Sequence, residues 1–72
     1  MEYVIVAFPD GREVFVDDGD GAVGVTNEMF ELEEGTHYLN LGQPLNYRPA
    51  TYLCRVTGTI PAAPMKIVFT KV

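Results

Sequence analysis

Few residues of this chain have side chains suited to chemistry. His37 is its only histidine and Cys54 its only cysteine, and serine and tryptophan are absent. A thiol beside an imidazole can act as nucleophile and base, but a third group must orient the base, and the spacing suggests none. Cys54 alternates with Tyr52 and Val56, which predicts a buried, inert thiol. We therefore expect no catalytic residue and no enzymatic activity.

Three aspartates, Asp17, Asp18 and Asp20, stand close together. Alternate carboxylates can converge on Ca²⁺, so these residues are a calcium candidate. The pattern of a calcium loop does not continue, because Val23 stands where a glycine is required. The sequence GDGAVG at residues 19–24 matches a dinucleotide fingerprint, but it opens no helix and its aspartate would repel a pyrophosphate. A solvated acidic turn is the prediction, and no cofactor is expected.

Short segments of alternating apolar and polar residues must position these groups. They are separated by turn residues every 8 to 12 positions, which is typical of an all-β sandwich or barrel. The predicted strands cover residues 3–8, 13–17, 23–25, 29–32, 36–41, 50–57 and 65–72. We expect one domain over residues 1–72, a small antiparallel β-sandwich or open barrel of about six or seven short strands without substantial helix.

Two strand positions follow from these segments. The turn at residues 9–12 contains proline and glycine and predicts a hairpin between the first two strands. The segment 50–57 has apolar residues on both faces, which predicts a central strand covered on both sides.

Motifs spread over residues 14–49 resemble those of a PEGA-type β module. The motif residues are Val14, Val16, Asp17 and Gly19; Gly24, Thr26 and Asn27; Leu32, Gly35 and His37; and Asn46, Tyr47 and Pro49. Asp18 is an insertion relative to the family, and Asn27 replaces a proline. The resemblance implies a surface or scaffold domain that brings no catalytic residues. It implies structural roles for Gly35, His37, Asn46, Tyr47 and Pro49, with Asn46 in a glycine slot where asparagine tolerates a left-handed backbone.

Charge is distributed unevenly along the sequence. The first 34 residues hold all ten acids and one base, Arg12, whereas the remainder holds four bases and no acid. If strands from the two halves alternate in space, opposite charges become cross-strand neighbours. The alternatives are an acidic face that meets a basic partner, or a dipolar module that stacks head to tail. The net charge of -5 argues against direct binding of nucleic acid.

Two functions from different classes fit this sequence. The first is a non-enzymatic protein-interaction or structural β module of PEGA-like type, whose protein partner meets a strand edge or the apolar loop 60–65. The same loop also fits a cap over the open end of the core. The candidate contact residues are Arg55, Ile60, Pro61, Pro64, Met65 and Lys66.

The second is a small acidic protein that occupies a basic groove on a nucleic-acid-binding partner, as a DNA mimic or inhibitor. Its contact face would be Asp17, Asp18, Asp20, Glu31, Glu33 and Glu34. Binding that weakens steeply with salt would favour this function over the first. We expect a monomer or a weak homo-oligomer.

The N-terminal sequence gives no targeting signal. It lacks a basic region, a long apolar run and a small-residue cleavage site, and no stretch of 18 apolar residues follows. A single cysteine also indicates a reducing compartment. We expect a cytoplasmic protein if the chain is a full gene product, and an undetermined location if it is part of a longer exported protein.

Overall fold

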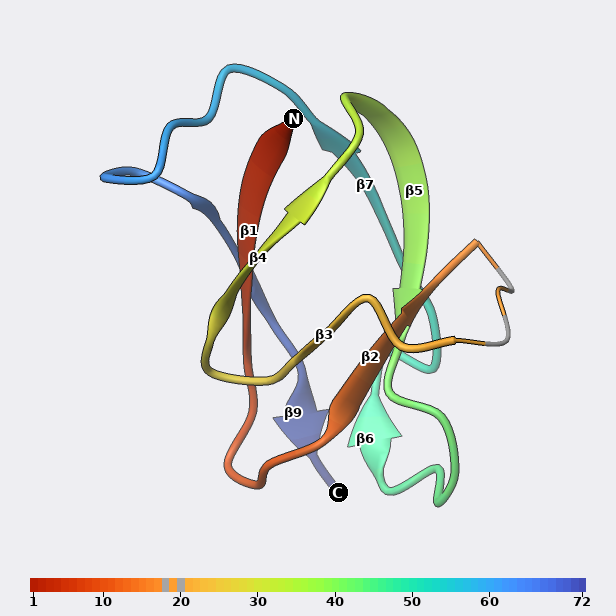
Figure 1. Cartoon of the computed structure of the whole chain (residues 1–72). Helices are drawn as coiled ribbons and strands as arrows, with labels where there is room; N and C mark the ends of the chain where they lie inside the picture. Colours follow the sequence, from red (N-terminus) through yellow and green to blue (C-terminus); the bar gives the residue numbers. More distant parts are fainter. Residues whose placement is uncertain (18, 20) are drawn as a thin grey trace.

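Nine short strands run through the part of the chain that the computed structural model describes, which is residues 1–17, 19 and 21–72 (Figure 1). In chain order they are β1 (Glu2–Ala7), β2 (Glu13–Val16), β3 (Gly24–Val25), β4 (Met29–Leu32), β5 (Gly35–Asn40), β6 (Tyr47–Arg48), β7 (Tyr52–Val56), β8 (Met65–Val68) and β9 (Thr70–Lys71). These residues contain no helix, so the expected all-β fold is confirmed. A helix with the length and apolar character for crossing a bilayer is likewise not found among them.

The strands form two main sheets and a small ribbon. One sheet has three strands in the order β4-β1-β8, the other has four in the order β3-β2-β5-β7, and β6 pairs with β9. Strand β6 lies in a stretch expected to be a loop, and the last predicted strand is divided into β8 and β9 by Phe69. These divisions raise the number of strands above the expected count.

One strand pair departs from the expected antiparallel arrangement. β1 and β8 pair in parallel, with Val4 opposite Met65 and Ala7 opposite Val68. A parallel pair needs a long connection between its two strands, and here most of the chain forms that connection. The first and last long strands are therefore neighbours, and the two halves of the sequence interleave in space.

The predicted hairpin of β1 and β2 is wrong. β1 pairs with β4 and β8, whereas β2 pairs with β3 and β5 in the other sheet. Both strands have a fully buried face, carrying Val4 and Val6 on β1 and Val14 on β2. The connection at residues 9–12 therefore crosses from one sheet to the other, so that the two apolar faces oppose each other instead of lying side by side. The turn at residues 33–34 does the same between β4 and β5.

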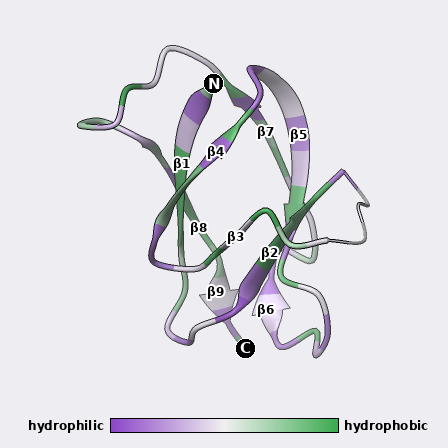
Figure 2. Cartoon of the chain, in the orientation of Figure 1, coloured by the Kyte–Doolittle hydropathy of each residue, from purple (hydrophilic) through white to green (hydrophobic). Residues whose placement is uncertain are grey.

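The core lies between the inner faces of the two sheets. Hydrophobic and hydrophilic bands alternate along β4 in Figure 2, as expected for a strand with one buried face. One cluster joins the buried residues of both sheets with Tyr47 of β6. Its members are Val4, Val6, Phe8, Val14, Phe30, Leu32, Leu39, Leu41, Tyr47, Cys54, Val56, Ile67 and Phe69.

Strand β7 is an edge strand, so the prediction of a central strand covered on both sides is wrong. It pairs with β5 alone in the four-stranded sheet. Cys54 and Val56 face the core, while Leu53 and Arg55 on the other face are exposed. Apolar residues on both faces of a strand do not require two covering layers, because a single exposed leucine costs little.

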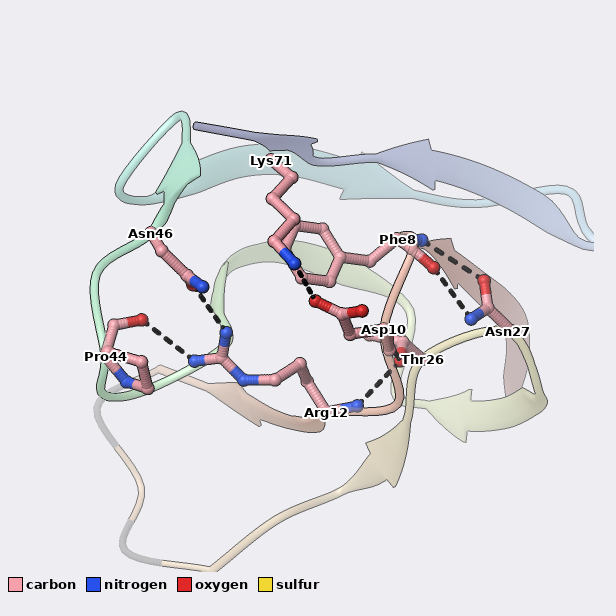
Figure 3. A network of polar contacts seen from close by, with 8 residues as sticks. All are labelled: Phe8, Asp10, Arg12, Thr26, Asn27, Pro44, Asn46 and Lys71. Atoms are coloured by element: carbon pink, nitrogen blue, oxygen red, sulfur yellow. Dashed lines mark hydrogen bonds and ion pairs between the residues drawn. The ribbon is translucent and has the colours of Figure 1, made fainter.

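Arg12 connects the crossing segment to the loop that precedes β6 (Figure 3). Its Nη1 donates to Asn46 Oδ1 at 2.8 Å, and its Nη2 donates to the carbonyl oxygens of Leu41 and Pro44 at 3.1 and 3.0 Å. Its guanidinium carbon also lies 5.4 Å from the centre of the Tyr47 ring, a cation–π distance. Arg12, the one base in the first 34 residues, therefore stabilises the fold through these contacts.

Two asparagines act differently from the expectation. Among the described residues, the non-glycine residues with positive φ are Asp17 and Asn27, so the left-handed backbone expected at Asn46 is wrong. Asn46 acts through its side chain, as an acceptor for Arg12. Asn27 accepts from the Phe8 N–H at 3.2 Å and donates to the Phe8 carbonyl at 2.8 Å, and so pairs with the end of β1 as a strand would (Figure 3).

Arg12→Ala should destabilise the protein by about 2–3 kcal/mol, because it removes charge-assisted hydrogen bonds and cation–π contacts together. Arg12→Lys keeps the charge without the planar fork and should lose roughly half as much. The measurement is urea unfolding, with a lower midpoint at an unchanged slope. Arg48→Ala, at an exposed arginine on β6, is the matched control and should stay within about 0.5 kcal/mol of the wild type.

Gly24 of β3 packs against the ring of Phe30, and an added Cβ there would lie 2.5 Å from Phe30 Cγ. Gly24→Ala should therefore destabilise the fold by about 1–3 kcal/mol, the usual cost of overpacking. Gly11 has no atom within 4 Å of an added Cβ. Gly11→Ala should be neutral in the same unfolding experiment, and an equal loss for both variants would contradict the steric explanation.

Candidate functional site

His37 lies on the inner face of β5 and joins three segments of the chain. Its Nδ1 is 2.7 Å from Asp17 Oδ2, and its Nε2 is 2.7 Å from the carbonyl oxygen of Glu33. The other carboxylate oxygen of Asp17 accepts from the Tyr38 N–H at 3.0 Å. The histidine therefore fixes the end of β2 to the connection between β4 and β5.

These contacts set the charge state of the pair. Both partners of the imidazole are hydrogen-bond acceptors, so both ring nitrogens donate only when the ring is protonated. The bond to Asp17 and the bond to the Glu33 carbonyl raise the pKa of His37 above its ordinary value of 6.5. The Tyr38 N–H and His37 lower the pKa of Asp17. The arrangement is that of an ion pair which holds backbone in place.

Cys54 is the cross-strand neighbour of His37 in the β5–β7 pair. The thiol is buried, and burial raises the pKa of Cys54, which disfavours the thiolate. Both nitrogens of His37 already have partners in Asp17 and Glu33. The two residues are thus brought side by side, but the geometry does not activate the thiol as a nucleophile.

The expected acidic face is only partly available for a partner. Asp17 bonds to His37, and the carboxylate of Glu34 accepts from the Thr57 hydroxyl at 2.7 Å. Glu31 and Glu33 are exposed at β4. Asp18 and Asp20, which complete both this face and the calcium candidate, lie outside the described residues. Within the described part of the chain, no three acidic, histidine or cysteine side chains are grouped to hold a metal ion.

The predicted apolar contact loop is divided between solvent and core. Ile60 and Pro61 are exposed, whereas Pro64 and Met65 are half-buried and Met65 packs against the core. The start of this segment is tied to β1, because Glu2 Oε1 accepts from Thr59 at two positions, 2.8 Å from its nitrogen and 2.6 Å from its hydroxyl oxygen. The residues at the two ends of the loop are thus held by the rest of the fold, while Ile60 and Pro61 are exposed.

The two bases expected to flank this loop lie on different sheets. Arg55 is on the outer face of β7 in the four-stranded sheet, and Lys66 is on the outer face of β8 in the three-stranded sheet. The two candidate contact bases that flank the loop in the sequence therefore belong to different sheets. The reason is that the loop connects one sheet to the other.

An exposed apolar pair on the outer face of β5 and β7 was missed at the sequence level. Tyr38 and Leu53 are directly opposite each other in the strand register, and they are 52% and 57% exposed. Thr36 and Arg55 form the next outward pair. The signal in the sequence was Leu53, an apolar residue between two polar ones on the same face. This surface adjoins the unpaired edge of β7.

An open apolar hollow of about 510 Å³ lies where β1 and β8 end. The residues around it come from the ends of these strands and from the turns beside them. They are Ala7, Phe8, Pro9, Asn27, Val68, Phe69, Thr70 and Lys71. Its one cation, Lys71, is already paired with Asp10 at 2.7 Å.

The stability of the fold should depend on pH through the His37–Asp17 pair. His37 has a raised pKa in the folded state, so its contribution is complete below about 6.5 and disappears as the pH rises through the folded-state value. The pKa of Asp17 is lowered below 3.8, so its contribution is present above that value and disappears in stronger acid. Urea midpoints measured from pH 4 to pH 9 should fall on the alkaline side in the wild type.

His37→Gln removes the titrating group and should flatten the alkaline part of this profile. Asp17→Asn is the second variant, because it keeps an acceptor for the Tyr38 N–H but removes the charge opposite His37. A wild-type profile that is flat between pH 6 and pH 9 would contradict the assignment of a charged pair.

Comparison of the chain with protein-family models, with curated proteins and with solved structures finds no match. The observations that bear on function are therefore the contacts and surfaces of this chain itself. Among them, the polar groups at His37, Asp17 and Arg12 bind parts of the fold to each other, and Tyr38 and Leu53 on β5 and β7 are exposed.

Proposed function

We propose that this chain is a non-enzymatic protein-interaction or structural β module of PEGA-like type. The single observation that carries the proposal is the pair Tyr38 and Leu53, exposed beside the free edge of β7. Such an edge offers unpaired N–H and C=O groups to an added strand, and the two side chains offer apolar contact beside it. The partner is a protein.

The chemistry of the surface supports an apolar partner contact over an electrostatic one. Aromatic residues and arginine are enriched among the residues that contribute most to binding at protein–protein interfaces. Here Tyr38 and Arg55 lie on one face, together with Leu53, which is opposite Tyr38. No acid is among the outward residues of β5 and β7. Contact at this face should therefore depend weakly on salt.

The acidic alternative, a protein that fills a basic groove on a nucleic-acid-binding partner, has less support from the contacts. Asp17 and Glu34 already accept hydrogen bonds within the chain, whereas Glu31 and Glu33 are exposed and Asp18 and Asp20 lie outside the described residues. Of the four described members of this face, two are therefore engaged within the fold, which reduces the charge that they offer to a basic groove.

Leu53→Lys should abolish most partner binding, with at least a tenfold loss of affinity, because it places an unpaired charge in the centre of the apolar contact. The experiment is capture of the native partner from cell extract with the immobilised domain, followed by titration of that partner at low and moderate salt. Leu45→Lys is the matched control, since Leu45 is 61% exposed but lies in the loop before β6. It should bind as the wild type does.

Two outcomes would count against the proposal. Loss of binding in Glu31→Lys and Glu33→Lys together with a steep fall with salt would favour the acidic alternative. Equal binding by Leu53→Lys and the wild type would remove the β5–β7 face from the contact.

A further inference from the structure

The outer face of the three-stranded sheet has an apolar centre with opposite charges on its two sides. Tyr3, Ile5 and Ala7 point outward along β1, since Val4 and Val6 between them face the core. The rows of side chains on this face follow from the strand register. Tyr3 lies opposite Glu31, Ile5 lies between Met29 and Lys66, and Ala7 lies opposite Val68.

The two sides of this face are exposed, and its centre on β1 is half-buried. Met29 of β4 is 44% exposed and Val68 of β8 is 55% exposed, one on each side of the β1 stripe. A domain of this size buries a smaller share of its surface than larger domains do. Apolar side chains that adjoin one another on the exposed surface mark a site of interaction. A partner that binds this face should itself present a row of apolar side chains.

The charges on this face are separated by the width of the sheet. Glu31 and Glu33 are exposed on the β4 side, and Lys66 is exposed on the β8 side. Among the described residues, the ion pairs within the chain are Lys71 with Asp10 and His37 with Asp17, so neither Glu31 nor Lys66 takes part in one. The complementary charges of this face therefore do not satisfy each other within the chain.

We propose that the occupant is a second copy of this chain, docked face to face through the β4-β1-β8 sheet. A two-fold axis that runs along β1 in the plane of contact exchanges the two sides of the sheet. It places β4 of one copy over β8 of the other at both edges, so that Glu31 of each copy faces Lys66 of the second copy. An axis across the strands would instead place acid on acid.

The distances along the strands are compatible with this contact. Glu31 lies at the level of Tyr3 and Lys66 at the level of Ile5, two residues apart on β1. That offset is about 7 Å, which the flexible lysine side chain and the usual crossing of packed sheets by about 30° can accommodate. The apolar stripes of the two copies then lie on each other at the centre.

The size of the face sets the strength of the dimer. One strand of six residues and two of four residues, spaced about 4.8 Å apart with about 3.3 Å per residue, give roughly 220 Å² on each copy, well below the size of a standard protein interface. The dimer should therefore be weak and reversible, and its affinity should fall as salt screens the four charges. This contact uses the sheet opposite the face proposed for the protein partner, so the two proposals are independent.

Charge reversal tests the arrangement in a way that simple loss of folding cannot imitate. Sedimentation equilibrium from about 10 µM to about 1 mM, concentrations that would reveal a weak dimer, should show a monomer–dimer equilibrium. Glu31→Lys and Lys66→Glu should each weaken self-association at least tenfold, because each places like charges at both edges. An equimolar mixture of these two variants should form a heterodimer, since every contact is then again between acid and base.

The controls separate this proposal from the previous one. Arg55→Glu reverses a charge on the other sheet and should leave the dimer unchanged, as should Leu53→Lys. Circular dichroism of each variant establishes that it folds. A wild type that stays monomeric up to about 1 mM overturns the proposal. It is also overturned if the mixed variants do not associate, or if Arg55→Glu rather than Lys66→Glu disrupts the dimer.

Discussion

The contacts of the Arg12 guanidinium hold the segment that crosses between the two sheets against the loop before β6 and the aromatic rings of the core. The guanidinium lies 5.8 Å from the ring centre of Phe8 and 5.4 Å from that of Tyr47, and it donates to the loop before β6. The Tyr47 ring in turn packs edge-on against Phe69 at 5.5 Å. A single cation thus connects the end of β1, the loop and the end of β8, where a small β fold has few apolar residues left to close its core.

The alternation of apolar residues predicted that Cys54 is buried on the same face as Tyr52 and Val56, and the structure agrees. It did not predict which strands pair. Alternation of apolar and polar residues determines which face of a strand is buried. The same alternation occurs whether the next strand in the sequence pairs with it in one sheet or lies across the core in the other sheet. The turn at residues 9–12 has hairpin chemistry, yet it crosses between sheets because Thr26 takes up its polar groups, accepting from the Arg12 N–H and donating to the Asp10 carbonyl.

The sequence also could not predict on which sheet each candidate contact residue lies, for a related reason. Arg55 and Lys66 are close in sequence on either side of one loop, but each belongs to a different sheet. Leu53 was assigned to a covered face because the sequence does not show that β7 has one neighbour only. Surfaces depend on strand order, and strand order here includes the parallel contact of β1 with β8, which joins residues about sixty positions apart. Local patterns carry no information on such a contact.

The polar contacts of Asp17 bear on how well the β5–β7 face is prepared for binding. Asp17 has a left-handed backbone with φ of 51°, and its N–H donates to the carbonyl of Tyr38 at 2.9 Å while its carboxylate accepts the Tyr38 N–H. Both backbone polar groups of Tyr38 are thereby fixed from β2, and His37 beside it is fixed by the same carboxylate. The exposed ring of Tyr38 stands on backbone that is held from two sides. If the β5–β7 face binds a partner as proposed, the backbone of Tyr38 loses little conformational freedom on binding, so the His37–Asp17 ion pair and the exposed apolar pair are parts of one arrangement.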